Sequence, residues 1–279
     1  MRNLLLMSLM IIPSFANAGQ VVNYWDNHIW YTSYGLTTGQ NWVNADQKYS
    51  RFAREGGAFQ GASAVIAFTG TGIKWIGGQG PNYGYATISM DGGAPVWMDN
   101  YAPTATSTHE NAVYQNLKYG THILKIEVTP YKNPASSDQW QAINYFEVDG
   151  VTAFPNSAAG WNVFRLAGNW AGGWGNSQDL SDGHCWSFAQ GASLGWSFKG
   201  NIVAVWGRPD VENGSFDVYI DGVWRGKVDE TFGYIDDDAL NADLIYVATD
   251  LGDGNHEINL VNSGPNGRAI QVDVIASFD

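Results

Sequence analysis

The amino-acid sequence predicts an all-β protein composed of two antiparallel β-sandwich domains in tandem, each with a jelly-roll arrangement. Short runs at 64–68, 86–90 and 122–128 alternate apolar and polar residues, which is typical of strands. Asp91-Gly92 and Asp221-Gly222 lie where hairpin turns need residues that tolerate positive φ. Regularly spaced strands with Gly-rich turns favour a β-sandwich. The nearest approach to a helical pattern is 236–244, where we expect at most one turn of helix.

A set of short motifs occurs twice in the same order, which predicts an internal duplication. The matched segments are 60–63 with 190–193, 68–70 with 198–200, 82–84 with 212–214, 88–92 with 218–222, 120–123 with 254–257, and 143–146 with 272–275. The two copies meet near Asp149-Gly150, ahead of Phe154. We therefore expect a first domain over 19–150 and a second over 151–279.

Residues 1–18 have the pattern of an export signal. Arg2 is followed by a short apolar run, and Ala16-Asn17-Ala18 supplies a small-residue cleavage site. The apolar run is shorter than the roughly 20 residues that cross a bilayer, and no later stretch is apolar enough to do so. The sequence therefore predicts cleavage near Ala18, release to the periplasm or the exterior of the cell, and no membrane span.

The composition narrows the classes of partner. The chain of 279 residues carries a net charge of -13, which disfavours nucleic acid, because phosphates favour Lys and Arg. The same charge disfavours an acidic polysaccharide bound through a simple basic patch, which leaves open a neutral glycan or an acidic one held through a metal ion or local Arg residues. Aromatic residues reach 14%, many of them Trp and Tyr, which suit both sheet cores and stacking surfaces. The lone Cys185, beside Trp186 and Phe188, is expected to be a buried, unreactive thiol.

The first copy resembles the galactose-binding-like β-sandwich modules that accompany many bacterial glycoside hydrolases, lyases and phage tail proteins. The resemblance rests on residues 49–50, 61–63, 68–73, 80–84, 91–92, 120–122 and 132–137. The second copy matches more loosely, with 262–266 in place of the Asn-Pro-Ala-Ser-Ser loop of the first. The resemblance implies a jelly roll with glycan-binding loops and, in many such modules, a structural calcium; it implies no cofactor and no single ligand. Such modules usually accompany a catalytic domain, and the two copies leave no residues for one.

A carbohydrate-binding function is the principal expectation. Indole and phenol rings in loops stack on the C–H faces of sugars, while Asn and Arg bond hydroxyl groups. The alternative for each ring is a place in the sandwich core. The candidate ligand-binding residues are Trp30, Tyr31, Trp42, Asn82, Tyr83, Asn133, Trp140, Trp170, Trp174, Arg208 and Arg268.

Two other classes of function stay open. A glycoside hydrolase needs two carboxyl groups across the scissile bond, and a polysaccharide lyase needs a base and a cation. The candidates for those roles are Asp210, Glu212, His184, Arg208 and Tyr234. Their spacing is not diagnostic, and the sequence has no nucleophile elbow, His-Glu-x-x-His or phosphate-loop motif. A structural subunit of a surface layer or filament is the third class.

Two features have a structural explanation that competes with a functional one. His122 and His256 each follow a Gly-x turn, and their repetition favours a role in the scaffold. Acidic residues crowd the second copy, and carboxylates are the ligands of calcium, although no EF-hand spacing is present. A solvated acidic face is the commoner explanation for such residues. These residues are Asp229, Glu230, Asp236, Asp237, Asp238, Asp243, Asp250 and Asp253.

Overall fold

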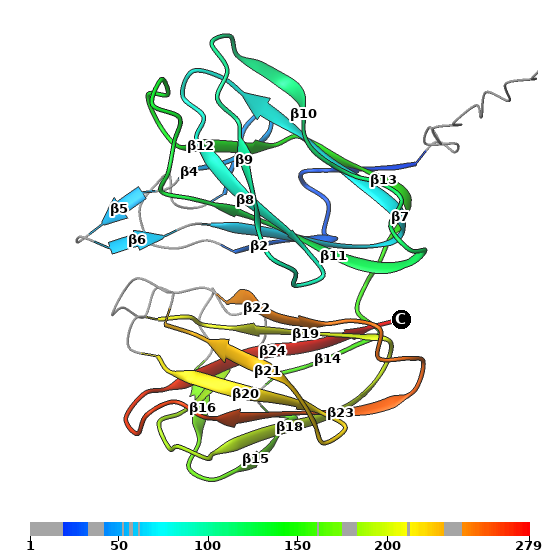
Figure 1. Cartoon of the computed structure of the whole chain (residues 1–279), viewed down its shortest axis with the longest axis vertical. Helices are drawn as coiled ribbons and strands as arrows, with labels where there is room; N and C mark the ends of the chain where they lie inside the picture. Colours follow the sequence, from blue (N-terminus) through cyan, green and yellow to red (C-terminus); the bar gives the residue numbers. More distant parts are fainter. Residues whose placement is uncertain are drawn as a thin grey trace, which may run out of the picture.

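The computed structural model describes residues 19–32, 42–51, 53–55, 58–60, 62–160, 162–174, 183–210, 213–231 and 242–279. Over these ranges the chain forms strands and no helix, which confirms the predicted all-β class (Figure 1). The strands pair as antiparallel ladders. Because the described part contains no helix, it also contains none that is long and apolar enough to cross a membrane. The expected helical turn lies mostly outside the described residues, and Asp243 begins a strand.

The strands fall into two groups, and no ladder joins one group to the other in the described ranges. We call residues 19–152 the first half and 157–279 the second half. The strands of the first half are β1 (Gln20–Asn23), β2 (Ile29–Thr32), β3 (Val43–Asn44), β4 (Lys48–Arg51), β5 (Ala53–Glu55), β6 (Ala58–Gln60), β7 (Ser63–Gln79), β8 (Tyr85–Met90), β9 (Val96–Asp99), β10 (Thr106–Tyr114), β11 (Gly120–Val128), β12 (Trp140–Ile143) and β13 (Tyr145–Thr152).

The long strand β7 belongs to both layers of the first half. Its first part pairs with β2 and β11, β11 also pairs with β8, and β8 pairs with β9. We call this set of strands the inner layer. Its second part pairs with β10 and β13 in the outer layer, and β13 also pairs with β1. Buried residues from both layers, including Ile66, Ile126, Trp75 and Phe146, form the core between them. The first half is therefore a sandwich, as predicted.

The second half has the same arrangement, with two strands in place of the long one. Its strands are β14 (Ser157–Ala159), β15 (Arg165–Ala167), β16 (Ala171–Trp174), β17 (His184–Ser187), β18 (Ser193–Lys199), β19 (Ile202–Gly207), β20 (Ser215–Ile220), β21 (Val223–Asp229), β22 (Asp243–Ala248), β23 (Asn255–Asn262) and β24 (Ile270–Phe278). The distal layer has the order β15-β18-β23-β20-β21. The facing layer has the order β16-β17-β24-β19-β22, with β14 on β24.

The Gly-x-His motifs form the same local structure in both halves. His122 Nδ1 lies 2.7 Å from Asp91 Oδ2, and its Nε2 lies 2.8 Å from the carbonyl oxygen of Lys118. His256 repeats this arrangement with Asp221 Oδ2 at 2.7 Å and the carbonyl oxygen of Gly252 at 3.0 Å. Both aspartates adopt positive φ, 55° and 53°, as the Asp-Gly hairpin turns require. Each histidine therefore joins the Asp-Gly turn to the turn that precedes its own strand, which is a scaffold role.

These His–Asp pairs should make stability depend on pH. The hydrogen bond to Asp91 raises the pKa of His122, and that to Asp221 raises the pKa of His256. A histidine whose pKa is raised in the folded protein contributes stability that is complete below the unfolded-state pKa of about 6.5. That stability is lost as the pH rises through the pKa of the folded state. Denaturant unfolding of wild type and His122→Gln/His256→Gln at about pH 5.5 and 8.5 tests this. Wild type should lose more stability between those pH values than the double variant. An equal loss in both proteins would contradict the assignment.

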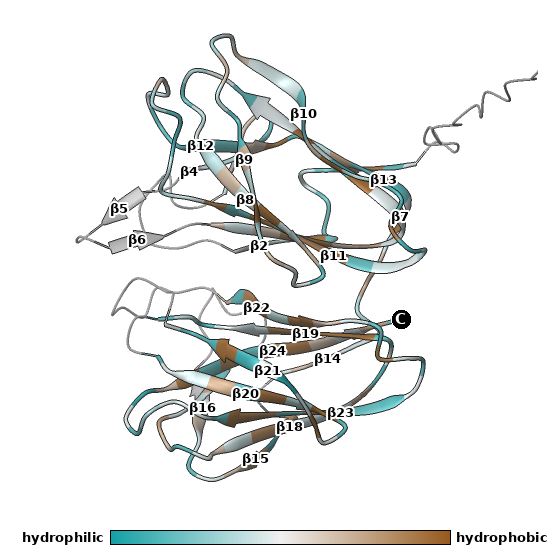
Figure 2. Ribbon diagram, viewed as in Figure 1, coloured by the Kyte–Doolittle hydropathy of each residue, from teal (hydrophilic) through white to brown (hydrophobic). Residues whose placement is uncertain are grey.

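The two halves pack sheet against sheet. Val65, Ala67 and Ile123 of the inner layer meet Trp206 and Phe278 of the facing layer in one buried cluster. Figure 1 shows β2, β7 and β11 above β22, β19 and β24, and Figure 2 shows apolar residues along the latter three strands. The run 64–68 is therefore buried on both faces, with Ala64, Ile66 and Phe68 in the core of their own half, so that it lacks the half-buried alternation expected from the sequence.

A buried ion pair joins the halves beside this cluster. Lys125 Nζ lies 2.7 Å from Asp243 Oδ2, and Ser63 Oγ donates to Asp243 Oδ1 at 2.8 Å. Glu127 also pairs with Lys125, at 3.3 Å. Burial alone lowers the pKa of Lys125, but the charges and hydrogen bonds of Asp243 and Glu127 raise it overall. Lys125 is therefore held as a cation at the boundary between the halves.

The outer layer of the first half and the distal layer of the second half both point away from this boundary. At positions that the repeat aligns with boundary residues of the other half, these two layers carry charged side chains. The repeat aligns Ala204 of the boundary with Lys74, which pairs with Glu110 at 3.2 Å and Glu147 at 3.3 Å on the outer layer. It also aligns Ile123 with Glu257, which pairs with Arg165 at 2.7 Å on the distal layer. Charges on these faces oppose the stacking of a second copy by the same contact.

Candidate functional site

Three of the aromatic residues expected to bind ligand have packing roles in the first half. Trp30 lies edge-on to Trp206, with ring centroids 5.8 Å apart, at the boundary between the halves. Trp42 is buried, and its indole donates to the carbonyl oxygen of Ser63 at 2.8 Å. Tyr31 packs on Trp42 at 5.2 Å. These rings serve the core and the boundary, and we do not assign them to a free ligand surface.

The loop candidates of the first half are also largely enclosed. Tyr83 is buried, with its phenol against Gly78, where a Cβ atom would lie 2.2 Å from the phenol oxygen. Burial raises the pKa of Tyr83 to about 12. Trp140 is half-buried and lies edge-on to Tyr49, with 6.4 Å between ring centroids. Asn82 is half-buried, and its carbonyl oxygen accepts the Trp140 amide at 3.1 Å.

The aromatic candidates of the second half lie near β16. Trp170 is half-buried against the core of its half, and its indole donates to the carbonyl oxygen of Ala167 at 3.1 Å. Trp174 ends β16, and its side chain lies outside the described residues. Arg268 is exposed in the turn before β24. Its carbonyl oxygen accepts the Asn262 amide at 3.3 Å, which anchors that turn.

Three of the candidate catalytic residues gather at one end of the second half. Arg208 Nη1 lies 3.1 Å from Nδ1 and 3.2 Å from Nε2 of His184, and both residues are buried. Asp210, two residues on, is buried as well. Asn213 donates to the Arg208 carbonyl oxygen at 2.7 Å and fixes this turn. The structure thus brings His184 of β17 into contact with Arg208, which follows β19; these are two of the three residues of the lyase-like alternative. Glu212 and Tyr234 lie outside the described residues.

Glu230 belongs to the same polar end, and the sequence did not mark it as a catalytic candidate. It is fully buried, and its Oε2 accepts the Gln271 amide at 2.9 Å. Burial raises the pKa of Glu230 well above its usual range, although the Gln271 hydrogen bond opposes the shift. Glu230 lies beside the turn that carries Arg208: its carbonyl oxygen accepts the Asp210 amide at 2.9 Å, and a Cβ atom on Gly207 would lie 2.7 Å from its Oε1. Glu230, Arg208 and His184 are all buried.

The acidic residues of the second half have separate contacts in the structure. Asp243 pairs with Lys125, Asp250 pairs with Lys118 at 3.0 Å, and Asp229 Oδ1 accepts the Thr231 amide at 3.0 Å. Across the described ranges, no three His, Cys, Asp or Glu side chains lie close enough together to hold a metal ion. Asp236, Asp237 and Asp238 fall outside those ranges. A calcium site therefore stays a prediction.

The first half presents an exposed aromatic surface on its inner layer. Trp97 and Tyr131 are 54% and 59% exposed, and their ring centroids are 5.5 Å apart. Tyr85 completes the group, 6.3 Å from Trp97. Beside them, Asn133 Nδ2 donates to Asp99 Oδ2 at 2.8 Å. We call Tyr85, Trp97 and Tyr131 the aromatic platform; it combines ring faces with a fixed amide and carboxylate.

The backbone holds this platform in place. Ala86 and Ile88 of β8 point into the core, so Tyr85 and Thr87 point outward, as does Trp97, which pairs with Thr87. The Tyr85 amide donates to the Tyr131 carbonyl oxygen at 2.9 Å, which joins the loop after β11 to β8. Trp97 was not among the ligand-binding residues predicted from the sequence. The available signal was a Trp soon after the Asp-Gly turn in both copies, at Trp97 and Trp224.

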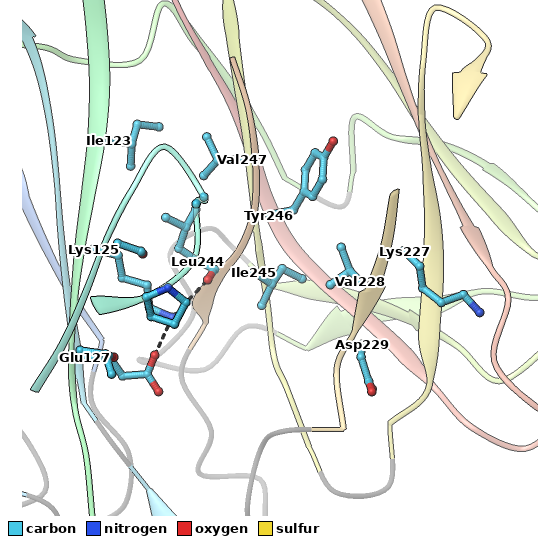
Figure 3. Close-up of a pocket in the computed structure, with 15 residues that line it drawn as sticks. Ile123, Lys125, Glu127, Lys227, Val228, Asp229, Leu244, Ile245, Tyr246 and Val247 are labelled. Atoms are coloured by element: carbon cyan, nitrogen blue, oxygen red, sulfur yellow. Dashed lines mark hydrogen bonds and ion pairs between the residues drawn. The ribbon is translucent and has the colours of Figure 1, made fainter. Parts of the chain in front are cut away.

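A groove between the halves lies next to the platform. Its volume is about 510 Å³, within the range of ligand sites. Figure 3 shows Lys125 and Glu127 on the side of the first half and β21 opposite, where Lys227 and Asp229 flank Val228 and the Lys227 ammonium group points away from Lys125. We call this space the boundary groove. Its lining is completed by Thr87, Ser89, Gly92, Gly93, Pro95, Ile123, Val228, Leu244, Ile245, Tyr246 and Val247.

The chain matches no known protein family's sequence profile. A curated protein, the A type blood alpha-D-galactosamine galactosaminidase of Flavonifractor plautii, is 26% identical over 210 residues. The match covers 74% of this chain but only 18% of the length of that protein.

Several solved structures have low similarity to the chain. A family 35 carbohydrate binding module from Clostridium thermocellum has 15% identity and a TM-score of 0.33, covering 43% of this chain and 96% of the module. A Paenibacillus xanthan lyase has 13% identity and a TM-score of 0.31, covering 92% of this chain and 25% of the lyase. The cycloalternan-forming enzyme of Listeria monocytogenes has 15% identity and a TM-score of 0.35, covering 82% of this chain and 20% of the enzyme. Similarity at this level defines no function for this chain.

Proposed function

We propose that this is an exported, neutral-glycan-binding protein whose binding surface is the aromatic platform of the first half. The observation that carries the proposal is the exposed pair Trp97 and Tyr131 beside the bonded Asn133 and Asp99. Aromatic faces accept the C–H side of a sugar ring, and a fixed amide and carboxylate donate to and accept from its hydroxyl groups. The signal-like pattern of residues 1–18 supports the export part of the proposal.

Three further observations support this class of function. The net charge of -13 disfavours polyanions, which leaves neutral glycans as the better ligands. The curated relative is named as a galactosaminidase, so glycans containing α-linked galactosamine belong among the first ligands to test. In the second half, Trp224 is exposed on edge strand β21, and its indole donates to Asp217 Oδ1 at 3.2 Å. Trp224 offers a second, smaller aromatic surface on the distal layer, and a ligand that bridges both surfaces would gain avidity.

The charged faces of the sandwich weigh against the filament class. Stacking of copies by the contact that joins the halves would bury Lys74, Glu110 and Glu147 on one side. On the other side it would bury Arg165 and Glu257. Lys74 faces two carboxylates, so stacking would bury an excess negative charge, and even the paired charges would lose their hydration. These faces therefore favour a discrete particle over an open polymer.

The platform makes a direct prediction for binding. Trp97→Ala and Tyr131→Ala should each weaken glycan retention by about 30-fold, the effect of removing a well-placed aromatic contact. A glycan array that includes α-galactosamine-containing glycans, followed by calorimetry on the best ligand, measures this. Because both rings are exposed, the thermal midpoint should change by no more than about 2–4 °C.

A matched control is Trp25→Ala, which removes another exposed indole far from Asn133 in sequence and with no place in the platform. Its affinity should equal that of wild type. Unchanged affinity in both platform variants would refute the platform as the binding surface. Loss of fold in those variants would show that the rings carry packing energy instead.

Catalysis on a polysaccharide is a second candidate, favoured by the contact between His184 and Arg208. An imidazole and a guanidinium are the groups that a lyase uses as base and as counter-charge. Incubation with the neutral polysaccharides that the platform retains and, separately, with uronate-containing polysaccharides, followed by assay for new reducing ends or unsaturated products, distinguishes the two functions. Products that disappear in His184→Ala with the fold intact would establish an enzyme. Retention without products supports binding alone.

A further inference from the structure

The boundary groove continues the aromatic platform along β8. Tyr85, Thr87 and Ser89 share the outward face of this strand, because Ala86 and Ile88 point into the core. Tyr85 belongs to the platform, whereas Thr87 and Ser89 line the groove. Thr87 is also the direct cross-strand partner of Trp97. Successive outward residues of a strand are about 7 Å apart, so the groove begins within one such step of the platform.

The charges in the groove are balanced. Lys125 is paired with Glu127 at 3.3 Å and with Asp243 at 2.7 Å, so its charge is compensated within the protein. Lys227 and Asp229 share the outward face of β21, and the charge of Lys227 helps to lower the pKa of Asp229, after the hydrogen bonds from Thr231. A groove of this kind has no excess cation for a polyanion, yet it offers both donors and acceptors.

The remaining lining suits the two kinds of surface on a sugar. Ile123, Leu244, Val247 and Pro95 supply apolar contacts, and the hydroxyl groups of Thr87 and Ser89 supply polar ones. The turn after β8 closes one end, because Gly92 contacts Val247 of the second half, where a Cβ atom on Gly92 would lie 3.1 Å from Val247 Cβ. Both halves therefore contribute walls to one ligand-sized space.

We propose that the boundary groove binds the continuation of the neutral glycan chain that stacks on Trp97 and Tyr131. The inference rests on the proposed glycan-binding function and adds that the ligand is an extended oligosaccharide held by both halves. The platform receives one end of the chain, and the following sugar units run along Thr87 and Ser89 toward Lys227 and Asp229 of β21.

The test measures affinity against chain length. Neutral gluco- and galacto-oligosaccharide ladders, from disaccharide to hexasaccharide, are titrated calorimetrically into wild type. Ser89→Trp fills the groove from β8, and Lys227→Ala/Asp229→Ala truncates the two exposed side chains through which β21 lines the opposite side. Thr108→Trp, on the exposed part of β10, is the matched control for added bulk. The longest ligands should bind wild type and the control about tenfold more tightly than the shortest, the gain expected from one or two additional hydrogen bonds.

In Ser89→Trp and in Lys227→Ala/Asp229→Ala this gain with length should disappear, while the affinity for the disaccharide stays unchanged. Equal affinity for short and long ligands in wild type, or a length gain that survives in both variants, overturns the groove proposal and leaves the platform intact. Absence of binding to every ladder overturns both proposals together. Tighter, salt-sensitive binding of oligogalacturonates would overturn the neutral class of ligand. Should Ser89→Trp fail to fold, the variant with two exposed substitutions decides alone.

Discussion

Asp243→Ala should lower the free energy of unfolding by about 3–5 kcal/mol, because it leaves the charge of Lys125 at the boundary without its closest partner. Asp243 is only 2% exposed, and its two oxygens accept from Lys125 at 2.7 Å and Ser63 at 2.8 Å. Glu127 remains near Lys125 but is more exposed, so it compensates only in part. Denaturant unfolding at neutral pH measures the loss.

Two controls separate burial from charge. Lys118→Ala removes a second ion pair between the halves, to Asp250, whose side chains are largely exposed, and should cost at most about 1 kcal/mol because solvent screens it. Lys125→Met/Asp243→Leu replaces both buried charges with apolar groups and should recover most of the stability. A loss of less than about 1 kcal/mol in Asp243→Ala would show that the pair is solvated and does not hold the halves together.

Trp206→Ala should have an effect of similar size, about 3–5 kcal/mol, because it leaves a cavity in the cluster between the halves. Trp206 is 3% exposed, and Trp30 lies edge-on to it at 5.8 Å. Its indole nitrogen has no hydrogen-bond partner among the described residues, so Trp206→Phe should retain more stability than Trp206→Ala. Trp30→Ala should cost less than Trp206→Ala, since Trp30 is only half-buried.

Glycan binding distinguishes this packing role from the ligand role that the sequence suggested for Trp30. Trp30→Ala should lose stability and retain its affinity for the ligand of the platform. The reverse result would return Trp30 to the binding surface. Trp224→Ala, in which an exposed indole is removed from the second half, should cost no more than about 1 kcal/mol and serves as the stability control.

Much of the fold could be predicted because strand pairing and turns depend on local patterns. The Asp-Gly pairs predicted hairpin turns, and Asp91 and Asp221 do adopt positive φ there. The alternation at 122–128 predicted a strand, and β11 covers that segment. The scaffold role of His122 and His256 followed from their repetition, and both bond the turn beside them.

The candidate site was predicted much less well, because exposure of an aromatic ring depends on what packs against it. In the sequence Trp42, Tyr83 and Trp97 are equally good candidates for an exposed aromatic ring. In the structure Trp42 and Tyr83 are buried and Trp97 is exposed. Asn133 was selected as a ligand-binding loop residue and lies close to exposed rings, whereas its partner Asp99 and the neighbouring Trp97 were not selected. The contact between His184 and Arg208 was expected only as one possible assembly among several.

The sequence alone determined the all-β class, the paired turns and the strands, since each depends on residues close together in the chain. Only the tertiary structure decided which faces meet. Lys125 and Asp243 are 118 residues apart, and no local pattern shows that one compensates the other. Val65 and Ala67 give the same apolar signal whether they face a core or a second sheet. The boundary, its groove and the exposed platform all follow from that packing, which non-local contacts alone establish.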